Sequence, residues 1–244
     1  MATIREITNE IVAWLRAYVT RAGASGYVVG LSGGIDSACS AALCQRAVGD
    51  RLLVVWMPCH SLQVDADMAG LVAKALGLTM LTVDLAPACD ALLAGLPPGT
   101  SDLARANLKP RLRMATLYAL AQTRGYLVAG TGNKSEIAVG YFTKYGDGGV
   151  DVEPLGSLYK WQIRDLAREV GIPQPVIDRP PTAGLWAGQT DEAEMGITYD
   201  DLDATLAAIE AGNTGNVDPA LLARVRQMIA ASAHKRVTPP ICPC

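Results

Sequence analysis

One segment of this chain constrains its fold more than any other: Gly30-Leu31-Ser32-Gly33-Gly34-Ile35-Asp36-Ser37. An apolar run, residues 27–29, precedes it, and a second apolar stretch, residues 38–48, follows it. This order predicts a strand, a tight glycine-rich turn and a helix. The backbone N–H groups of such a turn converge at the positive end of the helix dipole, where they can bind phosphate. A turn that merely needs two glycines explains the pattern less well, because its serines and its aspartate stand where phosphate and metal chemistry would use them.

The carboxylate of Asp36 makes this turn unusual. A neutral phosphate loop has no need of a carboxylate, whereas a Mg²⁺ ion that bridges protein and phosphates does. The segment lacks the G-x-x-x-x-G-K-[ST] pattern and is therefore not a Walker A loop. It resembles the S-G-G-x-D-S loop of the ATP pyrophosphatases, which split ATP between its α- and β-phosphates. The resemblance implies that ATP is bound by Gly30, Leu31, Ser32, Gly33, Gly34, Ile35, Asp36 and Ser37.

Length and composition favour one large α/β domain over residues 1–244. Half of the residues are hydrophobic and 18% are charged, so the chain can bury a sizeable core. The net charge of −3 gives no reason to expect a nucleic acid as the main partner. No apolar run is long enough to cross a bilayer, and Thr3-Ile4-Arg5-Glu6 predicts a helix capping box rather than a signal peptide. We expect a cytoplasmic protein with no membrane partner.

The six cysteines are scattered and form no C-x-x-C pair. The two histidines, His60 and His234, lie far apart in the sequence, so a structural zinc site is not expected. A reduced, cytosolic protein is the simpler interpretation. Cys242 and Cys244 could bind adventitious metal or belong to a frayed tail, and we assign them no role.

Apolar segments of strand length alternate with segments of helical period. We expect strands at residues 27–31, 52–57, 78–83 and 126–129, and helices at 4–21, 38–48, 64–76, 103–124, 159–170, 200–211 and 219–233. Pro110 is expected to break one helix, so that its regular part begins near Arg111. The alternation predicts a parallel sheet with helices on both faces, in three layers. Ligands of such sheets bind beyond the carboxyl ends of the strands, so the turns at 30–37 and 130–136 should face one cleft.

The second turn reads Gly130-Thr131-Gly132-Asn133-Lys134-Ser135-Glu136. It lacks the third glycine of a G-x-G-x-x-G dinucleotide fingerprint. Thr131 at the strand end is placed to hydrogen-bond a nucleotide, and Glu136 is placed to give a second carboxylate to the metal. Taken alone, Glu136 is explained better as an acid at a helix N-terminus that interacts with the dipole.

Further motifs follow in a fixed order: Y-F-T-K-Y-G-D-G-G-V-D from residue 141, P-L-G-S-L-Y-K from 154, P-T-A-G-L from 181, D-E-A-E-M-G-I-T-Y-D from 191, and H-K-R from 234. This series resembles the NAD synthetases over nearly the whole chain. That family belongs to the ATP pyrophosphatases and has a Rossmann-like fold of the adenine nucleotide alpha hydrolase type. Its members adenylate the carboxylate of deamido-NAD with ATP, releasing pyrophosphate, and ammonia then displaces AMP to give NAD.

The resemblance implies roles for individual residues. Asp36 and Glu136 would bind Mg²⁺, and Thr131, Lys160 and Thr182 would contact ATP. Asp36, Lys160 and Lys144 would be the catalytic residues. The contacts to deamido-NAD would be Arg111, Lys144, Asp151, His234 and Lys235. Without this context each lysine would be taken for a solvated surface residue. A homodimer is also implied, because the dinucleotide of the family lies against the subunit interface.

The chain departs from the family pattern in two places. Some members read G-T-D-H-x-x-E where this chain has Gly132 and Asn133, so a histidine or aspartate role cannot be transferred there. The adenine contact expected near residues 56–63 is not fixed, and Gln63 is a candidate. None of the cysteines has a glutaminase context, so free ammonia is the expected nitrogen donor unless a separate subunit supplies it.

Two other functions stay open at this point. The chain could be an ATP pyrophosphatase that adenylates a different acceptor, although the negative net charge argues against a tRNA base. It could also be a regulatory module that keeps the nucleotide cradle without catalysis. Both segments 141–151 and 181–196 are rich in Gly, Pro and Asp, and we expect them to be mobile without ligands and to become ordered when substrates bind.

Overall fold

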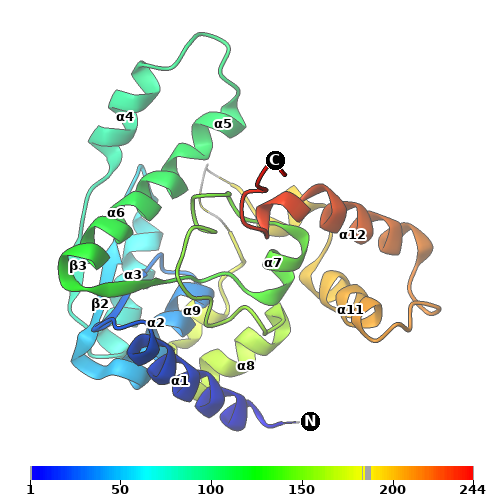
Figure 1. Cartoon of the computed structure of the whole chain (residues 1–244), viewed down its shortest axis with the longest axis horizontal. Helices are drawn as coiled ribbons and strands as arrows, with labels where there is room; N and C mark the ends of the chain where they lie inside the picture. The colour runs from blue at the N-terminus through cyan, green and yellow to red at the C-terminus, as the bar shows by residue number, and fades with distance from the viewer. Residues whose placement is uncertain (1, 183, 185–187, 244) are drawn as a thin grey trace.

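A computed structural model describes residues 2–182, 184 and 188–243 of the chain (Figure 1). Four parallel strands form one sheet in the order β3-β2-β1-β4. The strands are β1 (Gly26–Gly30), β2 (Leu52–Trp56), β3 (Met80–Thr82) and β4 (Tyr126–Ala129). The predicted parallel sheet flanked by helices is therefore confirmed.

Helices cover both faces of the sheet. Successive side chains of a strand point to opposite faces, so the apolar residues of β1 pack against helices on both sides. Val29 of β1 packs into one apolar cluster together with α1 (Ile4–Arg21), α2 (Ile35–Val48), α3 (Gln63–Ala75), α8 (Lys160–Val170) and α9 (Gln174–Ile177). Val28 packs into a second cluster with α4 (Ala86–Ala94) and α6 (Leu108–Arg124). Strands buried on both faces need apolar residues throughout, which explains the continuous apolar runs of β1 and β2.

A third apolar cluster lies outside the sheet layers. It is formed by α7 (Lys134–Val139), α10 (Asp191–Met195), α11 (Tyr199–Glu210) and α12 (Pro219–Ala231). Figure 1 shows α11 and α12 next to each other, on the side of α7 and α8 that faces away from the sheet. Helix α11 contacts both α7 and α8. This cluster joins the second half of the chain to the helices that begin at the strand ends. The single-domain organisation stays a prediction.

The helix boundaries agree closely with the local sequence signals. The Thr3 hydroxyl accepts the N–H of Glu6 at 3.2 Å and the Glu6 carboxylate accepts the N–H of Thr3 at 2.7 Å, so the predicted capping box is present. Asp218 caps α12, whose first residue is Pro219 as expected. No helix in the described part of the chain combines the length and the hydropathy that crossing a bilayer requires.

Two expectations were wrong in detail, and helix α4 was missed. Pro110 does not break the helix: α5 (Asp102–Ala106) ends before Asn107, and α6 begins at Leu108 with Pro110 in its first turn. A proline there loses no hydrogen bond, because the first N–H groups of a helix have no intrahelical partner. The third strand is shorter than predicted, with only three residues. Helix α4 was not predicted, because its nine residues are almost all apolar and show no helical period. Two short 3-10 turns, Gly49–Arg51 and Ala233–Lys235, complete the description.

Candidate active site

The glycine-rich turn between β1 and α2 leaves helix N–H groups without an internal partner. Gly34 occupies the N-cap position of α2 and makes no side-chain cap hydrogen bond. The hydroxyl of Ser37 donates to the carbonyl of Gly34 at 2.9 Å and lies 3.0 Å from the hydroxyl of Ser32. These bonds fix the turn, and the free N–H groups of the first helical turn are available to an anion.

Gly33 must be a glycine for two reasons. Its φ angle is +83°, a left-handed conformation that side chains disfavour. A Cβ atom at this position would also lie 2.5 Å from the backbone carbonyl oxygen of Asp65 in α3. The turn therefore packs directly against α3, which holds it beside the carboxyl end of β1.

Three charged side chains meet beside this turn, and all three were singled out from the sequence. The ammonium of Lys160 lies 2.6 Å from Asp36 Oδ2 and 3.3 Å from Glu136 Oε1. Lys160 is 4% exposed, Asp36 19% and Glu136 14%. The residues come from the first turns of α2, α7 and α8. Helices α2 and α7 follow the neighbouring strands β1 and β4, and α8 packs against α2.

Asn133 connects the two carboxylates and was missed by the sequence analysis. Its side-chain amide donates to Asp36 Oδ1 at 3.0 Å, and its side-chain oxygen accepts the N–H of Glu136 at 3.0 Å. Glu136 Oε2 in turn accepts the N–H of Asn133 at 3.1 Å, which completes a capping box. Glu136 thus acts as a helix-capping acid with one oxygen and faces Lys160 with the other. The N-x-x-E spacing was the signal available for Asn133.

Burial and charge shift the pKa values in this cluster. Burial raises the pKa of Glu136 to about 7, and the nearby Asp36 charge adds to the rise while Lys160 opposes it. Burial alone would lower the pKa of Lys160, but the carboxylates of Asp36 and Glu136 outweigh it and hold that pKa above its ordinary value. Lys160 therefore carries its positive charge at neutral pH.

The donor set suits a divalent cation of the Mg²⁺ type. Asp36 and Glu136 already hold the ammonium of Lys160 between them, so a cation is electrostatically favourable at this point. No group of three or more His, Cys, Asp or Glu side chains among the described residues forms a complete metal site. Mg²⁺ typically binds through one or two carboxylates together with substrate phosphates, so two carboxylates fit it.

One cavity of about 690 Å³ collects most of the predicted site residues. Both turns face it, as expected from the sheet topology, and the hydroxyl of Ser40 links helix α2 to the second turn by donating to the carbonyl of Gly130 at 2.9 Å. The predicted residues that line the cavity are Gly30, Leu31, Ser32, Gly34, Ile35, Asp36, Ser37, Arg111, Thr131, Glu136, Lys144, Lys160, Thr182, His234 and Lys235.

The basic residues near the C-terminus meet the 141–151 segment at the cavity wall. Lys144 donates to the carbonyl of His234 at 2.7 Å. Lys235 donates to the carbonyls of Gly140 and Phe142, both at 2.8 Å. These bonds bring together two motifs that lie about ninety residues apart in the chain.

Two candidate residues have other partners in this structure. The carboxylate of Asp151 accepts the N–H of Val128 at 2.8 Å and the hydroxyl of Tyr118 at 3.1 Å, at the edge of the sheet. Gln63 donates to Asp67 at 2.9 Å on the exposed side of α3. Thr182 lines the cavity, but its motif from residue 181 falls partly on residues 183 and 185, which lie outside the described residues.

Arg113 and Glu153 are charged residues near the site that sequence reasoning missed. Arg113 lines the cavity, donates to the carbonyl of Met57 at 3.2 Å and has a pKa lowered by burial. Glu153 accepts the N–H of Gly132 at 3.1 Å, and burial raises its pKa to about 8. A Cβ at Gly130 would lie 2.2 Å from Glu153 Oε2, so a larger residue there would displace the Glu153 carboxylate. Neither residue belongs to a motif that marks its role in sequence.

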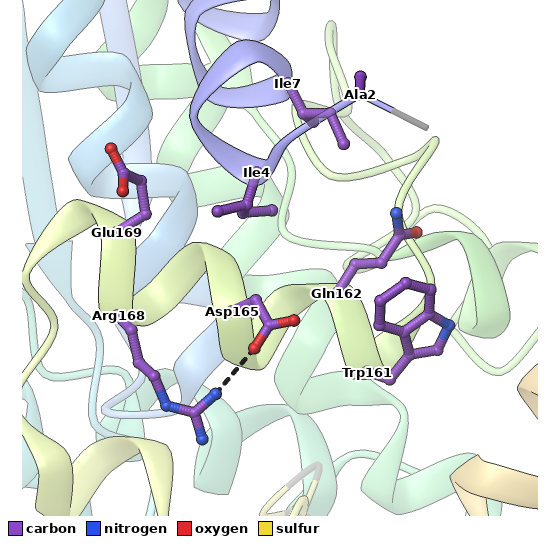
Figure 2. Close-up of a pocket in the computed structure, with 8 residues that line it drawn as sticks. All are labelled: Ala2, Ile4, Ile7, Trp161, Gln162, Asp165, Arg168 and Glu169. Carbon is purple, nitrogen blue, oxygen red and sulfur yellow. Dashed lines mark hydrogen bonds and ion pairs between the residues drawn. The ribbon is translucent and has the colours of Figure 1, made fainter.

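A second hollow, of about 530 Å³, lies between the start of α1 and helix α8 (Figure 2). Its wall includes Ile4 and Ile7 from α1 and Trp161 from α8, and Arg168 pairs with Asp165 at 2.8 Å. None of the described residues that were predicted for the site lines it. The first cavity is therefore the candidate active site.

Known proteins resemble the chain over nearly its whole length. A family model described as NAD synthase matches residues 7–239. The NH(3)-dependent NAD(+) synthetase of Carboxydothermus hydrogenoformans is 45% identical over 240 residues, covering 97% of this chain and 96% of the relative. The NH(3)-dependent NAD(+) synthetase of Archaeoglobus fulgidus is 44% identical over 239 residues, covering 97% of this chain and 96% of the relative.

Solved structures give the same result. The structure of NMN synthetase from Francisella tularensis superimposes with a TM-score of 0.91 at 36% identity and covers 100% of this chain and 99% of that one. The NH3-dependent NAD synthetase from Campylobacter jejuni has a TM-score of 0.86 at 29% identity and covers 99% and 100%. Since the family model and relatives well above 30% identity span almost all of it, this chain belongs to the NAD synthase family.

Proposed function

We propose that this protein is a ligase that converts the nicotinate carboxylate of deamido-NAD into the carboxamide of NAD, with ATP and ammonia as co-substrates. The observation that carries the proposal is one cavity of about 690 Å³ in which the glycine-rich turn, the Asp36–Lys160–Glu136 cluster and the basic residues near the C-terminus all meet. Membership of the NAD synthase family and relatives named as NH(3)-dependent NAD(+) synthetases support it.

The reaction has two steps. A carboxylate oxygen of deamido-NAD attacks the α-phosphorus of ATP, and the bond to the bridging oxygen breaks so that pyrophosphate leaves. Ammonia then attacks the activated carbonyl carbon, the C–O bond to AMP breaks, and the nitrogen loses a proton to give the carboxamide. A carboxylate resists nucleophiles, and adenylation converts its oxygen into a leaving group. The protein has to position the reactants and neutralise their charge.

The residues of the cavity divide these tasks. The free N–H groups in the first turn of α2 bind the ATP phosphates, and Lys160, Thr131 and Thr182 contact ATP. Lys144, Arg111, His234 and Lys235 contact deamido-NAD from the cavity wall. Asp151 is not among the described residues that line the cavity, and it contacts the dinucleotide from the edge of the sheet. The half-buried guanidinium of Arg113 adds positive charge to the same wall, which suits an anionic dinucleotide.

Asp36 and Glu136 are the residues that would hold Mg²⁺. The bound ion would neutralise the negative charge that builds up on the phosphates as pyrophosphate leaves. The ammonium of Lys160 lies between these two carboxylates. If a metal ion took its place there, the Lys160 side chain could turn toward the phosphates of ATP.

Free ammonia is the proposed direct nitrogen donor. The four cysteines nearest the catalytic elements, Cys39, Cys44, Cys59 and Cys89, are all buried, so none is exposed as a glutaminase nucleophile. Burial also raises the pKa of Cys59 to about 11, which disfavours its nucleophilic thiolate form. Thiol alkylation should leave the ammonia reaction intact.

A second substrate deserves a direct comparison, because the solved NMN synthetase superimposes on this chain with a TM-score of 0.91. Its product lacks the adenylate half of NAD, so the two activities differ in substrate length and share the carboxylate chemistry. The test is product analysis by chromatography after incubation with ATP, Mg²⁺ and ammonium, with either deamido-NAD or nicotinate mononucleotide. A higher kcat/KM for deamido-NAD supports the proposal, and a higher value for the mononucleotide contradicts it.

We further propose that the chain is a single domain that works as a homodimer. The long dinucleotide and ATP must share one cavity, and a second subunit gives the dinucleotide a wall to lie against. Light scattering of the purified protein should give twice the chain mass at concentrations where it is active. A fully active monomer would contradict this part of the proposal.

A further inference from the structure

Helix α11 presents two buried polar side chains, Tyr199 and Asp203, one turn apart on the same face. Tyr199 is 1% exposed and Asp203 is 3% exposed. A buried carboxylate and a buried hydroxyl are unfavourable unless they make hydrogen bonds, so the partners of these two side chains indicate what the helix does. Both sets of partners lie next to Glu136 and Lys160.

Tyr199 contacts the charged cluster directly. Its hydroxyl lies 3.0 Å from Glu136 Oε1, the same oxygen that faces Lys160, and 3.2 Å from Asp191 Oδ2. The ammonium of Lys160 lies 4.8 Å from the centre of the Tyr199 ring. The ring and the hydroxyl therefore restrain Lys160 and Glu136.

Asp203 holds the backbone that carries the same two residues. Its carboxylate accepts the hydroxyl of Ser135 and the backbone N–H of Trp161, the latter at 3.1 Å. The Ser135 oxygen in turn accepts the backbone N–H of Lys160 at 3.2 Å. Ser135 precedes Glu136 and Trp161 follows Lys160 in the chain, so one carboxylate ties the start of α7 to the start of α8.

We propose that Tyr199 and Asp203 are positioning residues that fix the separation of Glu136 from Lys160. The inference rests on the proposed function, since it assigns α11 to the support of the site that binds ATP and Mg²⁺. Catalytic groups must be held close to their productive geometry, and a displacement of about 1 Å can cost on the order of 100-fold in rate. Outer-shell partners of metal-binding carboxylates have effects of similar size.

The first test removes the Tyr199 hydroxyl and keeps the ring. Tyr199→Phe loses only the contact with Glu136 and Asp191 and preserves the packing of α11. The matched control is Thr205→Val on the same helix, which also removes one buried hydroxyl. Thr205 donates to the backbone carbonyl of Asp201 at 2.7 Å, within α11 and away from Glu136 and Lys160.

The first readout is Mn²⁺ affinity in the presence of ATP, measured by the loss of the free Mn²⁺ paramagnetic resonance signal. Tyr199→Phe should weaken Mn²⁺ binding by about 10-fold. It should also lower kcat and leave the KM for deamido-NAD unchanged, because the dinucleotide contacts lie elsewhere in the cavity. Thr205→Val should behave like the wild type in both measurements.

The second test examines the Asp203 route with a double-mutant cycle. Asp203→Asn and Ser135→Ala should each lower kcat, and the double variant should lose no more than the stronger single variant, because both residues act through one connection. Should Asp203→Asn fail to fold, Ser135→Ala must still lower both kcat and Mn²⁺ affinity.

The inference is overturned if Tyr199→Phe binds Mn²⁺ and turns over like Thr205→Val, or if the Asp203 and Ser135 effects are additive. The Mn²⁺ titration requires no turnover, so it judges the positioning role even if the wild-type protein makes no NAD. A wild type that makes no NAD would instead contradict the proposed function.

Discussion

The ammonium group of Lys160 lies 2.6 Å from a carboxylate oxygen of Asp36, although 124 residues separate them in the chain. The first turn of α2 supplies Asp36 and the first residue of α8 supplies Lys160, so packing of these helices at the strand ends makes the contact. Glu136 completes the cluster at 3.3 Å. A positive charge thus lies between two carboxylates, at the point where a metal ion and the phosphates of ATP would bind.

Replacing Asp36 with asparagine should abolish turnover and leave the fold intact, because Glu136 remains to pair with the buried Lys160. The substitution removes one metal-binding carboxylate at a turn outside the apolar core, so we expect a loss of at least about 100-fold in kcat. Steady-state kinetics at ordinary Mg²⁺ concentrations measure it, and circular dichroism checks the fold. Asp50→Asn removes an equal charge from an exposed turn and serves as the control. Normal activity of the Asp36 variant would remove this residue from the metal site.

Replacing Lys160 with methionine should destabilise the protein when no ligand is bound. The carboxylates of Asp36 and Glu136 would face each other without a cation, and breaking a buried ion pair typically costs about 3 kcal/mol. For a chain of this size that corresponds to a fall in Tm of roughly 6–12 °C. Mg²⁺ should raise the Tm of the variant more than that of the wild type, because it replaces the lost charge.

Lys134 offers the matched control for this prediction. It pairs with Glu210 at 2.6 Å on the protein surface, where an ion pair contributes about 0–1 kcal/mol. Lys134→Met should therefore change the Tm little and should not increase its response to Mg²⁺. Equal responses of the two variants to Mg²⁺ would count against a metal site at Asp36 and Glu136.

The sequence predicted the sheet and the turns well, because each rests on local signals. The runs at residues 27–29 and 52–56 are apolar throughout, as strands buried on two faces require, and the caps at Thr3 and Asp218 mark their helices. Helix α4 was missed because an almost wholly apolar segment shows no period. The expectation for Pro110 was wrong because a proline breaks a helix only in the helix interior, and Pro110 lies in the first turn of α6, where proline is tolerated.

The sequence predicted the charged residues of the candidate site, but it did not predict the residues of α11 that hold them in position. Asp36, Glu136 and Lys160 stand in recognisable segments, and the structure brings them together. Tyr199 and Asp203 act through contacts across 63 and 68 residues of sequence, which only the packing of α11 creates. Tyr199 stands in the motif that begins at residue 191 and Asp203 in none of the motifs, and neither position carries a local signal for its contact with the start of α7.

Glu153 should make stability depend on pH. Burial raises its pKa from 4.5 to about 8 in the folded protein, although the bond from the Gly132 N–H opposes the shift. Between these values the folded chain keeps a proton that the unfolded chain releases, so its contribution to stability falls as the pH rises. The glutamine of Glu153→Gln cannot titrate. The Tm of this variant minus the Tm of the wild type should therefore increase as the pH rises from about 5 to about 8.

Thermal unfolding at several pH values measures this difference. Glu10→Gln, on the exposed side of α1, controls for the loss of one negative charge. A constant Tm difference between Glu153→Gln and the wild type across the range would show that Glu153 titrates in the folded protein as it does in the unfolded chain.

The nitrogen donor predicts a pH dependence of a different kind. Only the neutral NH₃ form is nucleophilic, and at neutral pH it is a small fraction of total ammonium. The rate at a fixed, subsaturating ammonium concentration should therefore rise from about pH 7 toward about pH 9 while the enzyme stays folded. Glutamine alone should give no product. Turnover with glutamine that is lost on thiol alkylation, while the ammonium reaction survives, would reveal a glutaminase site.

The central claim is that this cavity uses ATP to adenylate deamido-NAD, and pyrophosphate release tests it most directly. Purified protein with ATP, Mg²⁺ and ammonium should release pyrophosphate only when deamido-NAD is added, in equal amounts with AMP and NAD. Pyrophosphate release that requires a different acceptor would point to another ATP pyrophosphatase. No turnover with any acceptor would point to a regulatory module. Pyrophosphate release that is independent of deamido-NAD would contradict the account.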